Sequence, residues 1–69
     1  MNLYRKGDKV KLTHIEPGLE AAATAYWSEF VGREGVIDQD QENPDDYIEV
    51  RFSEDDMFPA LDLEIERIR

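Results

Sequence analysis

The sequence predicts an all-β domain, a small five-stranded barrel with a long first loop that carries a short helix. Short runs that alternate between apolar and polar residues recur along the chain and are separated by polar turns, the pattern of half-buried strands. Helical spacing of apolar residues is confined to 19–30, which counts against a helical bundle. A chain of 69 residues supports only one core, so residues 1–69 are expected to form a single domain.

The first predicted strand covers residues 7–13, where Val10 and Leu12 alternate with polar side chains. The segment Glu16-Pro17-Gly18 ends this strand. Apolar residues then recur at helical spacing, at Leu19, Ala23, Tyr26 and Phe30. Because a helix of about a dozen residues is marginal without packing, we expect a long loop that carries a short helix.

The middle of the chain predicts two strands joined by a polar loop. A reversal near Gly32 leads into the β-branched pair Val36-Ile37, and the loop covers 39–46. The segment 47–52 is the clearest strand of the chain. Its apolar face would consist of Ile48, Val50 and Phe52, and its polar face of Tyr47, Glu49 and Arg51.

The last third predicts a second acidic turn at 53–56, a short edge strand at 57–59 and a final strand at 61–67. Pro59 restricts the second of these to an edge, because proline cannot donate to a central ladder. Closing so small a sheet would bury the apolar faces together and remove exposed edges. The expected core consists of Val10, Leu12, Val36, Ile48, Val50, Phe52, Leu63 and Ile65.

Four segments together resemble SH3-like small barrels of the KOW type, and the likeness spans nearly the whole chain: Gly7-Asp8-Lys9-Val10, Val31-Gly32-Arg33-Glu34-Gly35-Val36, Ile48-Glu49-Val50-Arg51-Phe52 and Leu61-Asp62-Leu63-Glu64. The resemblance implies a fold rather than a function, since such barrels serve many roles. Tyr26-Trp27 and the late Phe58 are also similar to the small ferredoxin-docking accessory proteins of photosystem I. Those proteins dock through basic residues, whereas the turns here are acidic, as in small phage and bacterial barrel proteins.

Charge is unevenly distributed along the chain, which has 8 Lys+Arg against 17 Asp+Glu and a net charge of −9. Residues 34–66 hold thirteen acidic residues and the single basic residue Arg51. Such a field repels phosphate backbones, so we expect no direct binding of nucleic acid. It attracts basic surfaces, so we expect a protein partner with a basic surface.

The candidate partner-binding residues are the acids of both turns and of the final strand, with the only tryptophan: Asp38, Asp40, Glu42, Asp45, Asp46, Glu54, Asp55, Asp56, Glu64, Glu66 and Trp27. On a strand, the carboxylates of Glu64 and Glu66 would project from one face about 7 Å apart, close to the spacing of phosphates along DNA. This predicts a phage-encoded decoy or inhibitor that mimics nucleic acid. For Trp27 two interpretations stay open, a partner anchor or a cap across one end of the barrel.

No arrangement of residues predicts catalysis or a cofactor. Ser28, Ser53 and the single His14 are not placed together by the sequence, and without cysteine a zinc site would need several carboxylates. The acids Asp38, Asp40, Glu42 and Glu49 match the spacing of a calcium loop, but Asn43 stands where such a loop needs glycine. We therefore expect a non-enzymatic protein without a cofactor, and at most weak calcium binding at 38–49.

Two alternatives to the decoy stay open. The acidic surface can serve solubility alone, or the chain can be a structural accessory subunit of a photosystem, ribosomal or transcription complex. The lack of cysteine and of long apolar runs predicts a cytoplasmic protein without a membrane segment. The sequence specifies neither the partner nor the oligomeric state.

Overall fold

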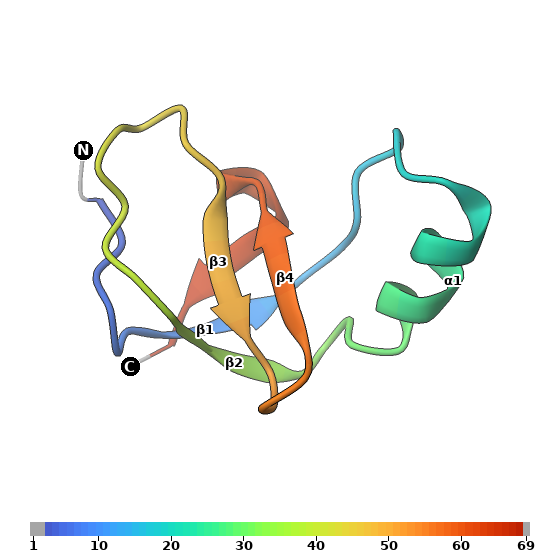
Figure 1. The fold of residues 1–69 in the computed structure, drawn as a ribbon, viewed down its shortest axis with the longest axis horizontal. Helices are drawn as coiled ribbons and strands as arrows, with labels where there is room; N and C mark the ends of the chain where they lie inside the picture. The colour runs from blue at the N-terminus through green and yellow to red at the C-terminus, as the bar shows by residue number, and fades with distance from the viewer. Residues whose placement is uncertain (1–2, 69) are drawn as a thin grey trace.

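The computed structural model describes residues 3–68. Its elements, in chain order, are β1 (Lys9–Leu12), α1 (Ala21–Ser28), β2 (Glu34–Ile37), β3 (Ile48–Arg51), β4 (Met57–Ala60), a 3-10 helix (Asp62–Glu64) and β5 (Ile65–Arg67). The strands form one antiparallel sheet in the order β4-β3-β2-β1-β5 (Figure 1). The all-β expectation is therefore confirmed in its broad form.

The sheet wraps around a core without closing into a barrel. β4 and β5 are its two edges, so the backbone ladder is open where a closed barrel was expected. All five strands nevertheless contribute to a single cluster of buried side chains: Tyr4, Val10, Leu12, Phe30, Ile37, Ile48, Val50, Phe58, Ala60 and Ile65. Pro59 lies in an edge strand, as predicted.

The predicted alternation holds in β3 and fails in β2. Ile48 and Val50 are buried, and Phe52 packs against the core from just beyond the strand. Val36 was expected inside, but its side chain is 41% exposed and Ile37 is buried instead. The cause is Gly35, where an added Cβ would lie 2.6 Å from a methyl group of Val50. A residue with a side chain does not fit there without a shift, so glycine takes the inward position and Val36 points outward.

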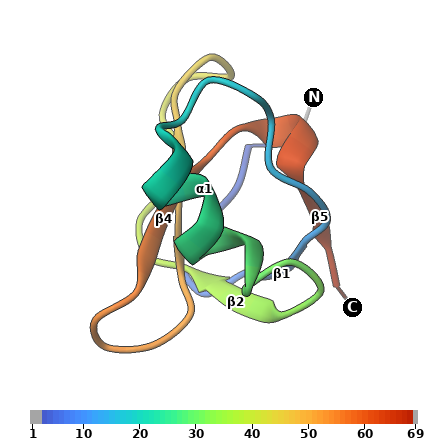
Figure 2. The ribbon, with the colours of Figure 1, turned by 90° about the vertical axis from the view of Figure 1, so that its right-hand side faces the viewer.

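The long loop carries α1, which is shorter than the expected stripe at 19–30 and buries a different set of side chains. Trp27 packs against the core, whereas Tyr26 is half exposed and Leu19 precedes the helix. The helix lies on the far side of the sheet from the yellow 39–46 loop (Figure 1). Figure 2 looks from the helix side and shows α1 in front of the strands.

The tail differs from the expected strand at 61–67. A 3-10 turn takes Asp62–Glu64, and only Ile65–Arg67 pair as a strand. The turn changes the alternation, so Leu63 is 57% exposed and Glu64 is buried. Leu63 was therefore placed in the core incorrectly, and Ile65 correctly.

Candidate protein-binding surface

The loop between β2 and β3 is held in shape by one buried amide, Gln41. Its backbone N–H donates to the carbonyl of Tyr4 at 2.9 Å, and the Tyr4 N–H donates to its Oε1 at 3.2 Å. Its Nε2 donates back to the carbonyl of Asp46 at 3.2 Å. Because a buried amide with bonded donors and acceptor tolerates little movement, these contacts fix both the loop and its attachment to the N-terminal segment.

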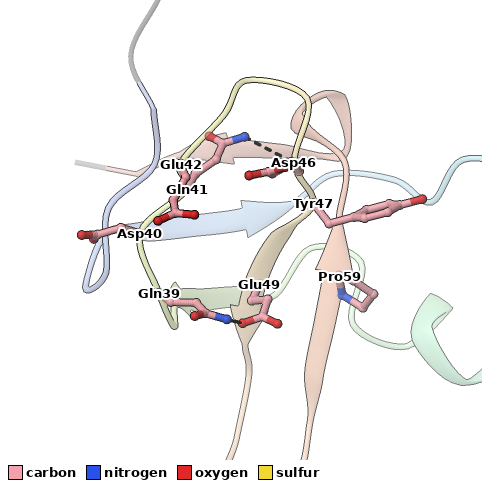
Figure 3. A pocket seen from close by; sticks show the side chains of 8 residues that line it. All are labelled: Gln39, Asp40, Gln41, Glu42, Asp46, Tyr47, Glu49 and Pro59. Atoms are coloured by element: carbon pink, nitrogen blue, oxygen red, sulfur yellow. Dashed lines mark hydrogen bonds between the residues drawn. The ribbon is translucent and has the colours of Figure 1, made fainter.

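An open hollow of about 610 Å³ lies between this loop and the outer face of β3 and β4 (Figure 3). Its lining combines carboxylates, amides, an aromatic ring and a proline: Gln39, Asp40, Gln41, Glu42, Asp46, Tyr47, Glu49 and Pro59. Four of these residues carry a carboxylate and none carries a positive charge. We call this site the acidic hollow.

Neutral groups position three of the four carboxylates. Asp40 Oδ1 accepts the backbone N–H of Lys6 at 2.8 Å, and Asp46 Oδ2 accepts that of Asn43 at 3.2 Å. Glu49 accepts the side-chain amide of Gln39 (Figure 3). Amide donors orient a carboxylate without cancelling its charge, so the concave surface keeps a concentrated negative potential.

Asp38 is engaged elsewhere, although the sequence suggested that it belongs to the same surface. Its Oδ1 accepts a hydrogen bond from Arg51 Nε at 2.8 Å. This bond to the guanidinium is the main cause that holds the pKa of Asp38 below its ordinary value. Its charge is therefore paired, and it does not line the acidic hollow.

The second acidic turn, at 53–56, is fastened to α1. Asp56 accepts a hydrogen bond from the Tyr26 hydroxyl and another from Ser53 Oγ at 2.7 Å. These two bonds, the tyrosine first, lower the pKa of Asp56, and the carboxylate in turn raises the pKa of Tyr26. Glu54 and Asp55 are exposed on the outside of this turn.

The predicted pair of projecting carboxylates in the tail is wrong, because Glu64 is only 4% exposed. Its Oε1 accepts the backbone N–H of Leu61 and its Oε2 that of Glu16, both at 2.7 Å. Glu64 thus joins the start of the long loop to the 3-10 turn. Glu66 is exposed, but in the sheet register it lies directly opposite Lys11, which is its neighbour on the same face.

Trp27 takes the capping position that was one of its two interpretations. Its ring centroid lies 5.0 Å from that of Phe30 and 5.0 Å from that of Phe58, with Phe52 at 6.3 Å. The ring is partly buried against the core. These contacts are those of a core aromatic at the end of the sheet.

The remaining acids and the groups considered for catalysis have ordinary surroundings. Asp45 is exposed beside the acidic hollow without lining it. Within residues 3–68, no group of three or more His, Cys, Asp or Glu side chains could hold a metal ion. His14 contacts Thr13 and Glu16, whereas Ser28 and Ser53 donate to Thr24 and Asp56.

Sequence reasoning missed four residues that shape the hollow: Gln39, Gln41, Tyr47 and Pro59. Only Tyr47 and Pro59 gave a signal, because the outward face of the predicted third strand and the proline of an edge strand both point to an exposed sheet surface. A glutamine in a polar loop carries no sign that it will be buried.

Comparisons of this chain with protein families, with curated proteins and with solved structures find no match. Among the described residues, no helix has the length and apolar character that crossing a membrane would require.

Proposed function

We propose that this protein is a non-catalytic acidic protein-binding module that receives a basic protein surface in the acidic hollow. One observation carries the proposal: the carboxylates of Asp40, Glu42, Asp46 and Glu49 line one concave surface, and its lining residues include no basic side chain. A concave surface of one sign focuses its field and accelerates the approach of an oppositely charged partner.

The proposal narrows the predicted binding surface. Asp38, Asp56 and Glu64 are used inside the fold, so the working carboxylates are those of the β2–β3 loop and β3. A nucleic-acid-mimicking decoy remains a more specific form of this proposal. It would have to use the acidic hollow rather than the Glu64–Glu66 pair, because Glu64 is buried.

The SH3-like small barrel is retained as the proposed fold family. Five short antiparallel strands around one core support it. The open ladder between β4 and β5 means that the family assignment rests on strand order and size, not on a closed barrel.

Paired charge neutralisations test the function. Glu42→Gln with Asp46→Asn removes two charges from the acidic hollow, and Glu54→Gln with Asp55→Asn removes two from the other turn. A linker histone is the probe, and its affinity is measured as ionic strength rises from about 0.01 to 0.15 M.

We expect the hollow variant to bind several-fold more weakly than the turn variant and to lose part of its salt dependence. Equal weakening by both variants would mean that only net charge matters, and the acidic surface would then serve solubility. Circular dichroism of both variants checks that the fold is retained.

A structural accessory subunit is the second candidate, because large apolar side chains are exposed beside the acidic hollow. Tyr47 is 66% exposed, and Leu61 and Leu19 also lie at the surface. Association that does not change with salt would favour this candidate.

A further inference from the structure

A second, smaller hollow adjoins the acidic one and is lined mainly by apolar groups. Its volume is about 180 Å³, and its residues come from the long loop, β4 and the 3-10 turn: Glu16, Pro17, Gly18, Leu19, Tyr47, Phe58, Pro59, Leu61 and Glu64. We call it the apolar hollow. The carboxylate of Glu64 accepts two backbone N–H groups there, so the surface left to a partner is largely apolar.

Tyr47 and Pro59 belong to both hollows, which are therefore continuous. The Tyr47 side chain points away from the loop carboxylates, toward the side of Pro59 (Figure 3). Its ring thus serves as a wall of the apolar hollow, while its backbone belongs to the rim of the acidic one. The two hollows form one surface with a charged half and an apolar half.

From this continuity we propose that the protein recognises a peptide segment of its partner in which an arginine or lysine stands next to a large apolar side chain. The basic side chain enters the acidic hollow, and the apolar one packs against Tyr47, Pro59 and Leu61. This inference rests on the proposed function and adds to it the side-chain pattern that is read.

Side chains, rather than an added strand, carry the recognition. β4 is an edge of the sheet and its backbone is available in principle, but Pro59 in its middle has no N–H to donate. A peptide that paired with β4 would leave a gap in the ladder at that position. Charge complementarity in one hollow and burial of exposed apolar surface in the other provide the alternative.

The test uses three labelled probe peptides of equal length: one alternating arginine and leucine, one with serine in place of leucine, and one with glutamine in place of arginine. Affinity for the unmodified chain is measured by fluorescence anisotropy at low and at physiological ionic strength. We expect the arginine–leucine peptide to bind about tenfold more tightly than the arginine–serine peptide, since burying one leucine has at least that effect.

Tyr47→Ala should remove most of that difference, because it deletes the wall of the apolar hollow. Val31→Ala is the matched control, since Val31 is also an exposed apolar residue but lines neither hollow. Both side chains are exposed, so both variants are expected to fold, and circular dichroism verifies this.

Equal affinity for the arginine–leucine and arginine–serine peptides, unchanged by Tyr47→Ala, would overturn this inference and leave the acidic module intact. Tight binding of the glutamine–leucine peptide would overturn the proposed function instead, and with it the pairing of charge and apolar contact. Failure of all three peptides to bind would overturn the inference, while the linker-histone experiment would still decide the function.

Discussion

The two acidic turns stand at opposite ends of β3, and they use their carboxylates in different ways (Figure 1). In the β3–β4 turn, Asp56 accepts hydrogen bonds from Tyr26 of α1 and from Ser53. In the β2–β3 loop, Asp40 and Asp46 accept backbone and amide N–H groups and face an open hollow. One turn fastens the long loop to the sheet, whereas the other presents charge.

The difference shows that the number of acids in a segment does not determine its role. What matters is the donor that each carboxylate meets. Asp38 illustrates the point, because it immediately precedes the presenting loop and yet pairs with Arg51. A cation neutralises the carboxylate it binds, while an amide leaves the charge available to a partner.

Destabilising β3 should have the largest effect, because both turns depend on this strand. Ile48 is 1% exposed, and Ile48→Ala should lower the free energy of unfolding by about 2–5 kcal/mol. Chemical denaturation measures this change. Tyr47→Ala, one residue earlier and largely exposed, should change stability by no more than about 0.5 kcal/mol. Similar losses in both variants would contradict the assigned inward and outward faces.

The contrast between structural and presented carboxylates is next in size, in the tail. Glu64→Ala removes the acceptor of two backbone N–H groups and should cost about 1–3 kcal/mol for each one left buried and unbonded. Glu66→Ala is the matched control, because this residue is exposed, and its effect should stay within about 0.5 kcal/mol. A Glu64→Ala variant as stable as Glu66→Ala would disprove the structural role.

Acid should weaken the contacts of Asp38 and Asp56. Both carboxyls have a folded-state pKa below the ordinary 3.8. Their stabilisation is therefore fully present above pH 3.8 and is lost as pH falls through the lower folded-state pKa. Thermal stability in an Asp38→Asn, Asp56→Asn variant should fall less steeply below that pH than in the unmodified chain. Parallel acid limbs would show that these two groups contribute nothing to the acid sensitivity.

The smallest expected effect is that of the Tyr26 hydroxyl. Tyr26→Phe removes the main cause that lowers the pKa of Asp56, so that pKa should rise toward its ordinary value. Carbon-13 NMR titration of the side-chain carboxyl measures the change. Tyr47→Phe removes a hydroxyl outside this turn and should leave the Asp56 titration unaltered; a shift of equal size there would argue against a direct bond.

The strands themselves follow from residue patterns that the sequence displays. Val10, Leu12, Ile48 and Val50 alternate with polar neighbours, and all four are buried as expected. Val36 could not be placed correctly, because its orientation depends on the close approach of Gly35 to Val50 across the sheet. Such an approach is a tertiary property that no local pattern contains.

The binding surface was less predictable than the strands. The acids of the β2–β3 loop were identified from composition, but the hollow exists because Gln41 is buried and Pro59 approaches from a distant strand. Likewise, Glu64 stands in the sequence as one member of an alternating tail. Only the 3-10 turn, which brings its carboxylate to the N–H groups of Leu61 and Glu16, shows that it is structural.

One measurement tests most directly the claim that the β2–β3 loop presents charge and the β3–β4 turn does not. An oligo-arginine peptide is titrated into the unmodified, isotope-labelled chain while backbone amide NMR signals are followed. We expect the largest shifts at 39–49, shrinking as salt is added, with small changes at 53–56. Shifts of equal size at both turns, or larger ones at 53–56, would contradict the claim.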